Sequence, residues 1–73
     1  MKCFRNDQRV EVVANGHPCA GKRGTVVRKR GQDDGAWIRF DEDLPDDLRS
    51  FPKGDDRQNH MMLWPDECEE VKA

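Results

Sequence analysis

Residues 21–40 read GKRGTVVRKRGQDDGAWIRF, and this stretch predicts two short strands joined by a polar turn. Glycines open the stretch, and apolar residues recur in both of its halves. The segment Gly31–Gly35 combines two glycines, a glutamine and two aspartates, which is the chemistry that closes a β-hairpin. We therefore expect a hairpin with strands over Arg23–Arg30 and Ala36–Phe40.

Side-chain alternation assigns the faces of these strands. In Ala36–Phe40, Ile38 and Phe40 share one face and Trp37 and Arg39 share the other, because successive side chains of a strand point to opposite sides. We expect the first pair to face the core and the second pair to face outward.

An earlier strand is predicted over residues 8–14, where polar and apolar residues alternate as far as Val12. Val10 and Val12 are expected to point inward. The Asn-Gly and Pro residues of Asn15–Gly21 break this pattern, so that segment is expected to be a loop.

A fourth extended segment is predicted over Gln58–Trp64, which Pro65 ends. Met61 and Leu63 are expected to point inward, and the outward positions are His60, Met62 and Trp64.

The chain after Pro65 predicts a short turn of 3₁₀ helix and a last strand. Cys68 and Val71 are expected to close the core there.

Residues 41–56 show no apolar periodicity and carry seven acidic residues and two prolines, which predicts a long acidic loop. Leu44, Leu48 and Phe51 are spaced four and three apart, which permits one helical turn with all three on one side. A loop of this length in a small domain is either functional or mobile.

Composition limits what the protein can be. A chain of 73 residues is expected to form a single domain over 1–73 with a compact core over about 8–71, and its net charge of −2 creates no global field for nucleic acid or membranes. The sequence has no apolar run of membrane-spanning length and no signal-peptide pattern, so we expect a soluble cytoplasmic protein. The three cysteines are an odd number without close pairing, which favours reduced thiols.

The predicted elements, five short strands with a long loop and a terminal turn, resemble the SH3-like barrel families. Gly21, Gly24 and Val26 are similar to the Gly-x-x-Gly-x-Val core of the KOW motif, a resemblance that implies RNA or protein binding. The order of Gly-Thr-Val-Val, Trp-Ile-Arg-Phe-Asp and Pro-Asp-Glu-Cys-Glu-Glu-Val is also similar to the SH3-like accessory subunits of photosystem I and ferredoxin-thioredoxin reductase. That resemblance implies a docking subunit that performs no chemistry.

Two outward tryptophans are the main candidates for binding. Trp37 and Trp64, flanked by Arg39 and His60, can stack a nucleobase or hold a partner peptide. The alternative is that one or both indoles pack under the long loop against Leu48 and Phe51 and so complete a small core.

A basic run supplies the second candidate surface. Five basic residues fall within nine positions and can contact phosphates: Lys22, Arg23, Arg28, Lys29 and Arg30. Strand alternation prevents all five from sharing one surface, and the acidic loop can neutralise some of them, so a solvated face is the alternative.

Metal and enzyme sites are not expected. The acidic loop lacks the spacing of a calcium loop, and the cysteines and histidines form no Cys-x-x-Cys knuckle. Ser50 is the only serine, no Gly-rich phosphate loop is present, and nothing orients His17 as a base for Cys19.

The sequence therefore predicts an all-β, five-stranded SH3-like barrel that acts without a cofactor as a small binding or accessory module. Its partner is expected to be a protein, with RNA or DNA as the alternative, and the unpaired outer strand of its sheet allows a monomer or a weak dimer. The expected interaction surface combines Trp37, Arg39, His60 and Trp64 with the basic strand, including Arg28 and Arg30.

Overall fold

The computed structural model describes residues 3–29 and 34–72, except for the side chains of Arg28 and Lys29. It contains five strands and two 3₁₀ turns, and the described residues form no α-helix. The strands are β1 (Arg9–Val12), β2 (Arg23–Lys29), β3 (Ala36–Phe40), β4 (His60–Leu63) and β5 (Cys68–Glu70), and the turns are η1 (Asp46–Leu48) and η2 (Pro65–Glu67). The all-β class predicted from the sequence is confirmed.

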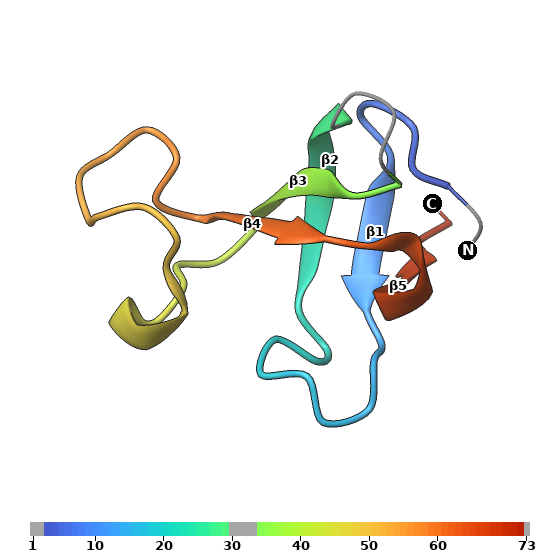
Figure 1. The fold of residues 1–73 in the computed structure, drawn as a ribbon, viewed down its shortest axis with the longest axis horizontal. Helices are drawn as coiled ribbons and strands as arrows, with labels where there is room; N and C mark the ends of the chain where they lie inside the picture. The colour runs from blue at the N-terminus through green and yellow to red at the C-terminus, as the bar shows by residue number, and fades with distance from the viewer. Residues whose placement is uncertain (1–2, 30–33, 73) are drawn as a thin grey trace.

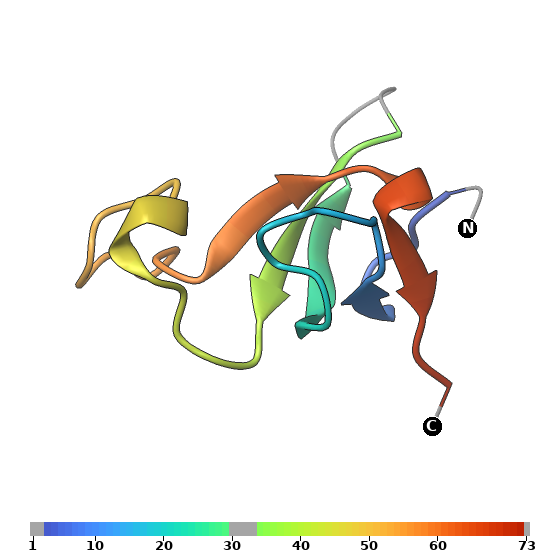
Figure 2. The same cartoon turned by 90° about the horizontal axis from the view of Figure 1, so that it is seen from below.

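The strands form one sheet in the order β4-β3-β2-β1-β5, with every neighbouring pair antiparallel. β2 and β3 pair as the predicted hairpin, although residues 31–33 of its turn lie outside the described residues. The sheet twists strongly, so that β3 and β4 run across β1 and β2 (Figure 1). The loop that carries η1 extends to one side, while η2 and β5 lie at the other (Figures 1 and 2).

The sheet is open at both edges. Among the described residues no pairing joins β4 to β5, so the barrel closure expected from the sequence is not seen. None of the described segments is a helix that is long and apolar enough to span a membrane.

The core lies on the inner side of the twisted sheet, and alternation predicted much of it. Val10 and Val12 of β1, Ile38 and Phe40 of β3 and Leu63 of β4 are all at most 3% exposed, as expected. Phe4, Cys19, Val26, Ala36, Leu44 and Cys68 complete the buried cluster. Met61 of β4 packs against this cluster without being fully buried.

The C-terminal end differs in one respect from the prediction. Cys68 is buried, but Val71 follows β5 and is only half-buried. The expectation that Val71 closes the core was wrong. Val71 still donates its backbone N–H to Arg9 O of β1 at 2.9 Å, but it lies three residues after buried Cys68, and alternation directs its side chain to the other face.

In the loop over 41–56, Leu44 is buried in the core, Leu48 packs against the core and Phe51 packs against Trp37, and the helical content of the loop is limited to η1. Asp41 binds Arg9 through two hydrogen bonds, one of them 2.7 Å between Arg9 Nη1 and Asp41 Oδ1. Other acidic residues of the loop also have partners: Glu42 with Lys22, Asp43 with Asn59, Asp46 with Arg49 and Asp55 with Arg57. The loop is therefore less strongly acidic as a surface than its composition suggests.

Candidate functional site

The outer face of the sheet carries a polar row that crosses four strands. Arg9 of β1 lies opposite Thr25 of β2, Thr25 lies opposite Arg39 of β3, and Arg39 lies opposite His60 of β4. Arg9 Nη1 donates to Thr25 Oγ1 at 2.9 Å. Two of the predicted site residues, Arg39 and His60, are thus direct cross-strand neighbours.

Beside this row lies a shallow cavity of about 260 Å³, which we call the aromatic groove. Its lining comes from three strands and the long connection before β4: Val27, Trp37, Phe51, Arg57 and His60. The ring of Trp37 lies 5.3 Å from that of Phe51 with an interplanar angle of 50°, and the Arg57 guanidinium lies 4.2 Å from the Phe51 ring centroid. Tilted aromatic pairs and a cation over a ring are both favourable contacts, and they fix the walls of the groove.

Val27 reaches the groove because of an irregularity in β2. The register between β2 and β3 shifts between Val26 and Arg28, so that Ile38 pairs with Val26 and Trp37 pairs with Arg28. The extra residue of such a bulge is left unpaired, and Val27 is 40% exposed at this point. An apolar side chain is thereby presented beside Trp37.

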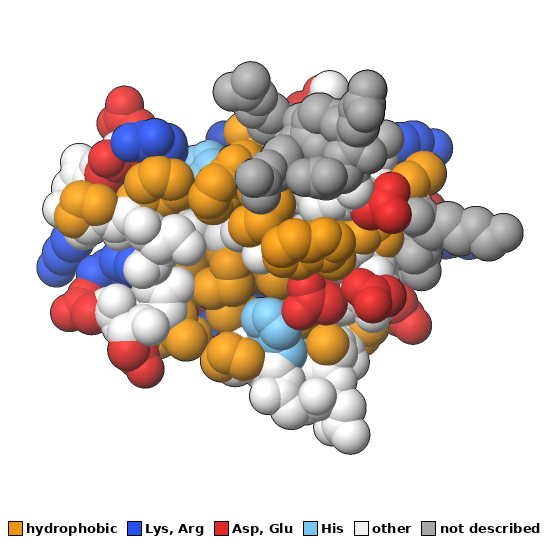
Figure 3. Space-filling view, in the orientation of Figure 1, with side chains coloured by type: hydrophobic (Ala, Val, Ile, Leu, Met, Phe, Trp, Pro, Cys, Tyr) orange, Lys and Arg blue, Asp and Glu red, His pale blue; other side chains and the backbone are white. Residues whose placement is uncertain are grey.

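The two tryptophans occupy different positions. Trp37 is half-buried and its ring lies against Phe51, which is one of the two loop contacts of the packing alternative; Trp37 does not belong to the buried core cluster. Trp64 does not line the groove and is 45% exposed. It covers Gly35, where an added Cβ would lie 3.2 Å from Trp64 Cε2 and 3.2 Å from Met62 Sδ. Hydrophobic side chains accordingly gather across this face, over β3 and β4 (Figure 3).

His60 lies in the wall of the aromatic groove and also lines a neighbouring recess of about 360 Å³ that includes Arg39, Asp55 and Asp56. Burial lowers the pKa of His60, the guanidinium groups of Arg39 and Arg57 lower it further, and the backbone of Arg57 and the carboxylate of Asp55 oppose the shift. Its Nδ1 atom is buried and makes no hydrogen bond to any of the residues that the structure describes. The neutral imidazole is therefore the favoured form at neutral pH.

The predicted basic surface is not assembled by the described residues. Lys22 lies 3.4 Å from Glu42, and Arg23 Nε lies 2.8 Å from Glu11 Oε1, so both cations are neutralised locally. The side chain of Arg28 and the whole of Arg30 lie outside the described residues. Arg39 is exposed and has no ion pair within the part of the chain that the structure describes.

The cysteine and histidine pair at 17–19 does not form a nucleophile with its base. Cys19 is fully buried, burial raises the pKa of its thiol against the opposing charge of Lys22, and its Sγ lies 3.8 Å from Met61 Sδ. His17 Nδ1 instead accepts a hydrogen bond from the backbone N–H of Cys19 at 3.0 Å, and its Nε2 lies 3.4 Å from Glu67 Oε2. His17 therefore links the loop after β1 to η2.

Metal-ligating groups are dispersed in the described residues. Over 3–29 and 34–72, no three His, Cys, Asp or Glu side chains gather closely enough to hold a metal ion. The free cysteines are Cys3 on the surface and Cys19 and Cys68 in the core.

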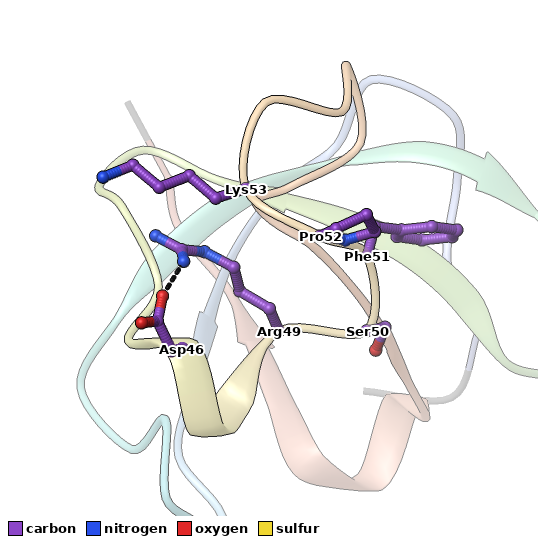
Figure 4. A pocket seen from close by; sticks show the side chains of 6 residues that line it. All are labelled: Asp46, Arg49, Ser50, Phe51, Pro52 and Lys53. Carbon is purple, nitrogen blue, oxygen red and sulfur yellow. Dashed lines mark hydrogen bonds and ion pairs between the residues drawn. The ribbon is translucent and has the colours of Figure 1, made fainter.

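A larger hollow, of about 410 Å³, is formed by the long loop alone (Figure 4). It is lined by Asp46, Arg49, Ser50, Phe51, Pro52 and Lys53. Arg49 pairs with Asp46 there, and the Phe51 ring points away from the Arg49 and Lys53 side chains (Figure 4). Because one segment supplies every wall and the aromatic ring is directed elsewhere, we place the candidate site at the aromatic groove.

Three residues of the groove, Val27, Phe51 and Arg57, are not among the binding residues that the sequence predicts. The sequence indicates Phe51 only as a packing residue, and it does pack against Trp37. Its spacing with Leu44 and Leu48 in a loop of charged residues is the sequence signal for that packing. Comparison of the chain with family models, curated proteins and solved structures gives no match.

Proposed function

We propose that this protein is a small non-catalytic module that binds a protein partner through the aromatic groove and the adjoining surface of Trp64. The observation that carries the proposal is an exposed apolar surface on one face of the sheet. Val27 and Trp64 are 40% and 45% exposed, and they flank half-buried Trp37 and Met62. Clustered aromatic side chains that form a shallow pocket are typical of the residues that dominate protein interfaces.

The size of the groove supports a protein ligand. A volume of about 260 Å³ lies below the roughly 300–1,000 Å³ of small-molecule pockets. It suits a single large side chain projecting from a partner, as at the centre of a protein interface.

The charges of the described surface also favour protein over nucleic acid. A protein that follows a phosphate backbone needs several free cations, because each neutralised phosphate adds to the affinity. Arg5, Arg9, Lys22, Arg23, Arg49 and Arg57 all have carboxylate partners. Few described cations are therefore left for phosphates.

An SH3-like accessory domain is the architecture that we propose for this function. Five short strands, a long loop between β3 and β4 and a 3₁₀ turn before β5 are the features that carry the resemblance. The β4 and β5 edges would complete a barrel if they approached each other.

A selection from a phage-displayed library of random peptides tests the proposal, because such a selection does not require the identity of the partner. We expect enriched peptides to contain a large apolar residue and, in NMR titrations of the labelled protein, to shift the indole N–H signal of Trp37. Trp37→Ala and Arg57→Ala should each reduce affinity by about tenfold, which is the size of a side-chain contact of about 1.4 kcal/mol.

The matched control is Val13→Ala, because Val13 is 39% exposed and does not line the groove. Arg57 is exposed, so Arg57→Ala tests the groove even if Trp37→Ala fails to fold. No enrichment, or enriched peptides that bind these variants equally well, would reject the proposal. Salt-sensitive binding of single-stranded RNA at the same indole signal would support the nucleic-acid alternative instead.

A further inference from the structure

We propose that the partner segment of the aromatic groove carries an acidic residue beside its large apolar side chain, and that Arg39 binds this carboxylate. The inference depends on the proposed function and specifies the chemistry of the ligand. The apolar side chain would contact Val27, Trp37 and Phe51, and the carboxylate would lie over the polar row at Arg39.

Among the side chains that the structure describes, Arg39 is an arginine of this face without an ion pair. Two other arginines of this face are paired with carboxylates. Arg9 binds Asp41 at 2.7 Å, and Arg23 binds Glu11 at 2.8 Å. The hydrogen bonds from Arg9 chiefly lower the pKa of Asp41, and Arg39 and Arg23 contribute through their charges. Asp41 therefore lies within the field of three guanidinium groups but bonds directly to only one.

The position of Arg39 matches the end of the groove. Arg39 and Trp37 are two residues apart on β3 and therefore project from the same face of the strand. His60, the cross-strand neighbour of Arg39, lines both the aromatic groove and the recess that contains Arg39. An apolar side chain in the groove would place an adjacent residue of the same peptide at this recess.

Two carboxylates that line the recess, Asp55 and Asp56, influence how well it can bind an acidic ligand. Asp55 is held by Arg57, with 3.1 Å between Arg57 Nε and Asp55 Oδ1, so its charge is largely compensated. Asp56 is exposed and has no ion pair within the described residues, so it would repel an acidic ligand. Removing the charge of Asp56 should therefore strengthen binding.

Of the cations that the structure describes beside the groove, one unpaired guanidinium fits one carboxylate better than a nucleic-acid backbone. A bound strand presents successive phosphates, which need successive cations. A guanidinium binds one carboxylate through up to two parallel hydrogen bonds. We therefore argue for an acidic peptide, and treat nucleotide binding as a competing result.

The test uses three acetylated and amidated hexapeptides, Ser-Gly-Trp-Xaa-Gly-Ser, in which Xaa is Glu, Gln or Lys. Affinity is measured by NMR titration at low and moderate salt. We expect the Glu peptide to bind about fivefold more tightly than the Gln peptide, as one exposed ion pair permits, and the Lys peptide to bind most weakly. Higher salt should reduce the difference.

Arg39→Gln should remove the preference for Glu without changing the affinity for the Gln peptide, and Asp56→Asn should increase the preference. Lys72→Gln is the control, since it changes the net charge by the same amount as Arg39→Gln. Lys72 lies at a different hollow, beside Glu69 and Glu70. Equal binding of the three peptides, or preference for the Lys peptide, would overturn this inference and leave the proposed function standing. Failure of all three to bind would overturn both, and tighter binding of adenosine or uridine monophosphate would replace the acidic peptide with a nucleotide.

Discussion

Trp37 and Trp64 both point outward by alternation, yet their surroundings assign them different roles. Trp37 contacts Phe51, a residue that the long loop brings back onto the sheet, and so forms a fixed wall. Trp64 covers Gly35, which has no side chain to compete for the space. A ring held by neighbours loses little conformational freedom on binding, so Trp37 is the better anchor and Trp64 the more adaptable contact.

The three thiols are expected to differ sharply in reactivity. Burial and the nearby carboxylates of Glu67 and Asp66 raise the pKa of Cys68 to about 11, and burial also raises the pKa of Cys19. Only the thiolate reacts readily, so both core thiols should resist alkylation in the native protein, whereas exposed Cys3 should react. Mass spectrometry after brief iodoacetamide treatment should show a single label in buffer and labels on all three cysteines in urea. Rapid native labelling of Cys19 or Cys68 would show that the core opens easily.

His60 should make stability depend on pH below neutrality. Because its pKa is below the usual 6.5 in the folded state, the unfolded chain binds more protons between the two pKa values. The contribution of His60 is therefore complete above about pH 6.5 and declines as the pH falls below that value. Urea unfolding of the wild type and of His60→Gln should show a pH-dependent difference in this range. An identical pH profile for wild type and His60→Gln would contradict the assignment.

At the scale of elements, β2 is the central strand of the sheet, with β3 and β4 on one side and β1 and β5 on the other. Gly24 lies opposite Val10 of β1 and Phe40 of β3. A Cβ at this position would lie 2.5 Å from the backbone oxygen of Arg39 and 2.8 Å from Ile38 Cγ2. Glycine is required at this position because β3 approaches β2 too closely to leave room for a side chain.

Gly24→Ala is expected to destabilise the protein by about 1–3 kcal/mol or more, because a backbone atom rather than a flexible side chain must move. Chemical denaturation monitored by tryptophan fluorescence measures the change. The control is Thr25→Val on the same strand, which keeps the β-branched shape and should change the free energy of unfolding by less than about 1 kcal/mol. A stability for Gly24→Ala equal to that of the control would show that β2 and β3 separate at low cost.

Features that depend on a single strand could be predicted from the sequence, whereas those that depend on contacts between distant segments could not. The inward positions of β1, β3 and β4 follow from alternation, which is a property of each strand alone, and Val10, Ile38 and Leu63 are buried as predicted. The bulge that exposes Val27 depends on pairing between two strands, and the contact of Phe51 with Trp37 depends on the path of a loop. Neither leaves a periodic signal. Packing of an indole against Phe51 could be stated only as an alternative, and three of the five groove residues, Val27, Phe51 and Arg57, were not predicted as binding residues.

For the whole molecule, the main electrostatic property is charge pairing between distant segments. The sequence shows a basic run and an acidic loop, but Lys22 binds Glu42 and Arg9 binds Asp41 across strands. Arg5 similarly binds Glu70, joining the two ends of the described chain at 2.6 Å. Each exposed pair contributes little alone, so their main effect is to remove a free electrostatic surface.

Asp41→Asn tests this pairing through its dependence on pH. Hydrogen bonds from Arg9 hold the pKa of Asp41 below its usual value, so the stability contributed by the carboxylate is present above about pH 4 and is lost as the pH falls through the folded-state pKa. Wild type should exceed Asp41→Asn in stability at pH 7 by up to about 1 kcal/mol, and the two should converge in acid, where the protonated carboxyl is neutral like the amide. Urea unfolding from pH 7 to pH 3 measures the difference, with Asp47→Asn as a control, because Asp47 has no ion pair within the described residues. A stability difference that stays constant with pH would show that the charge of Asp41 does not cause it. The effect would then come from the shape of the side chain or from neutral hydrogen bonds, and not from attraction to Arg9, Arg23 and Arg39.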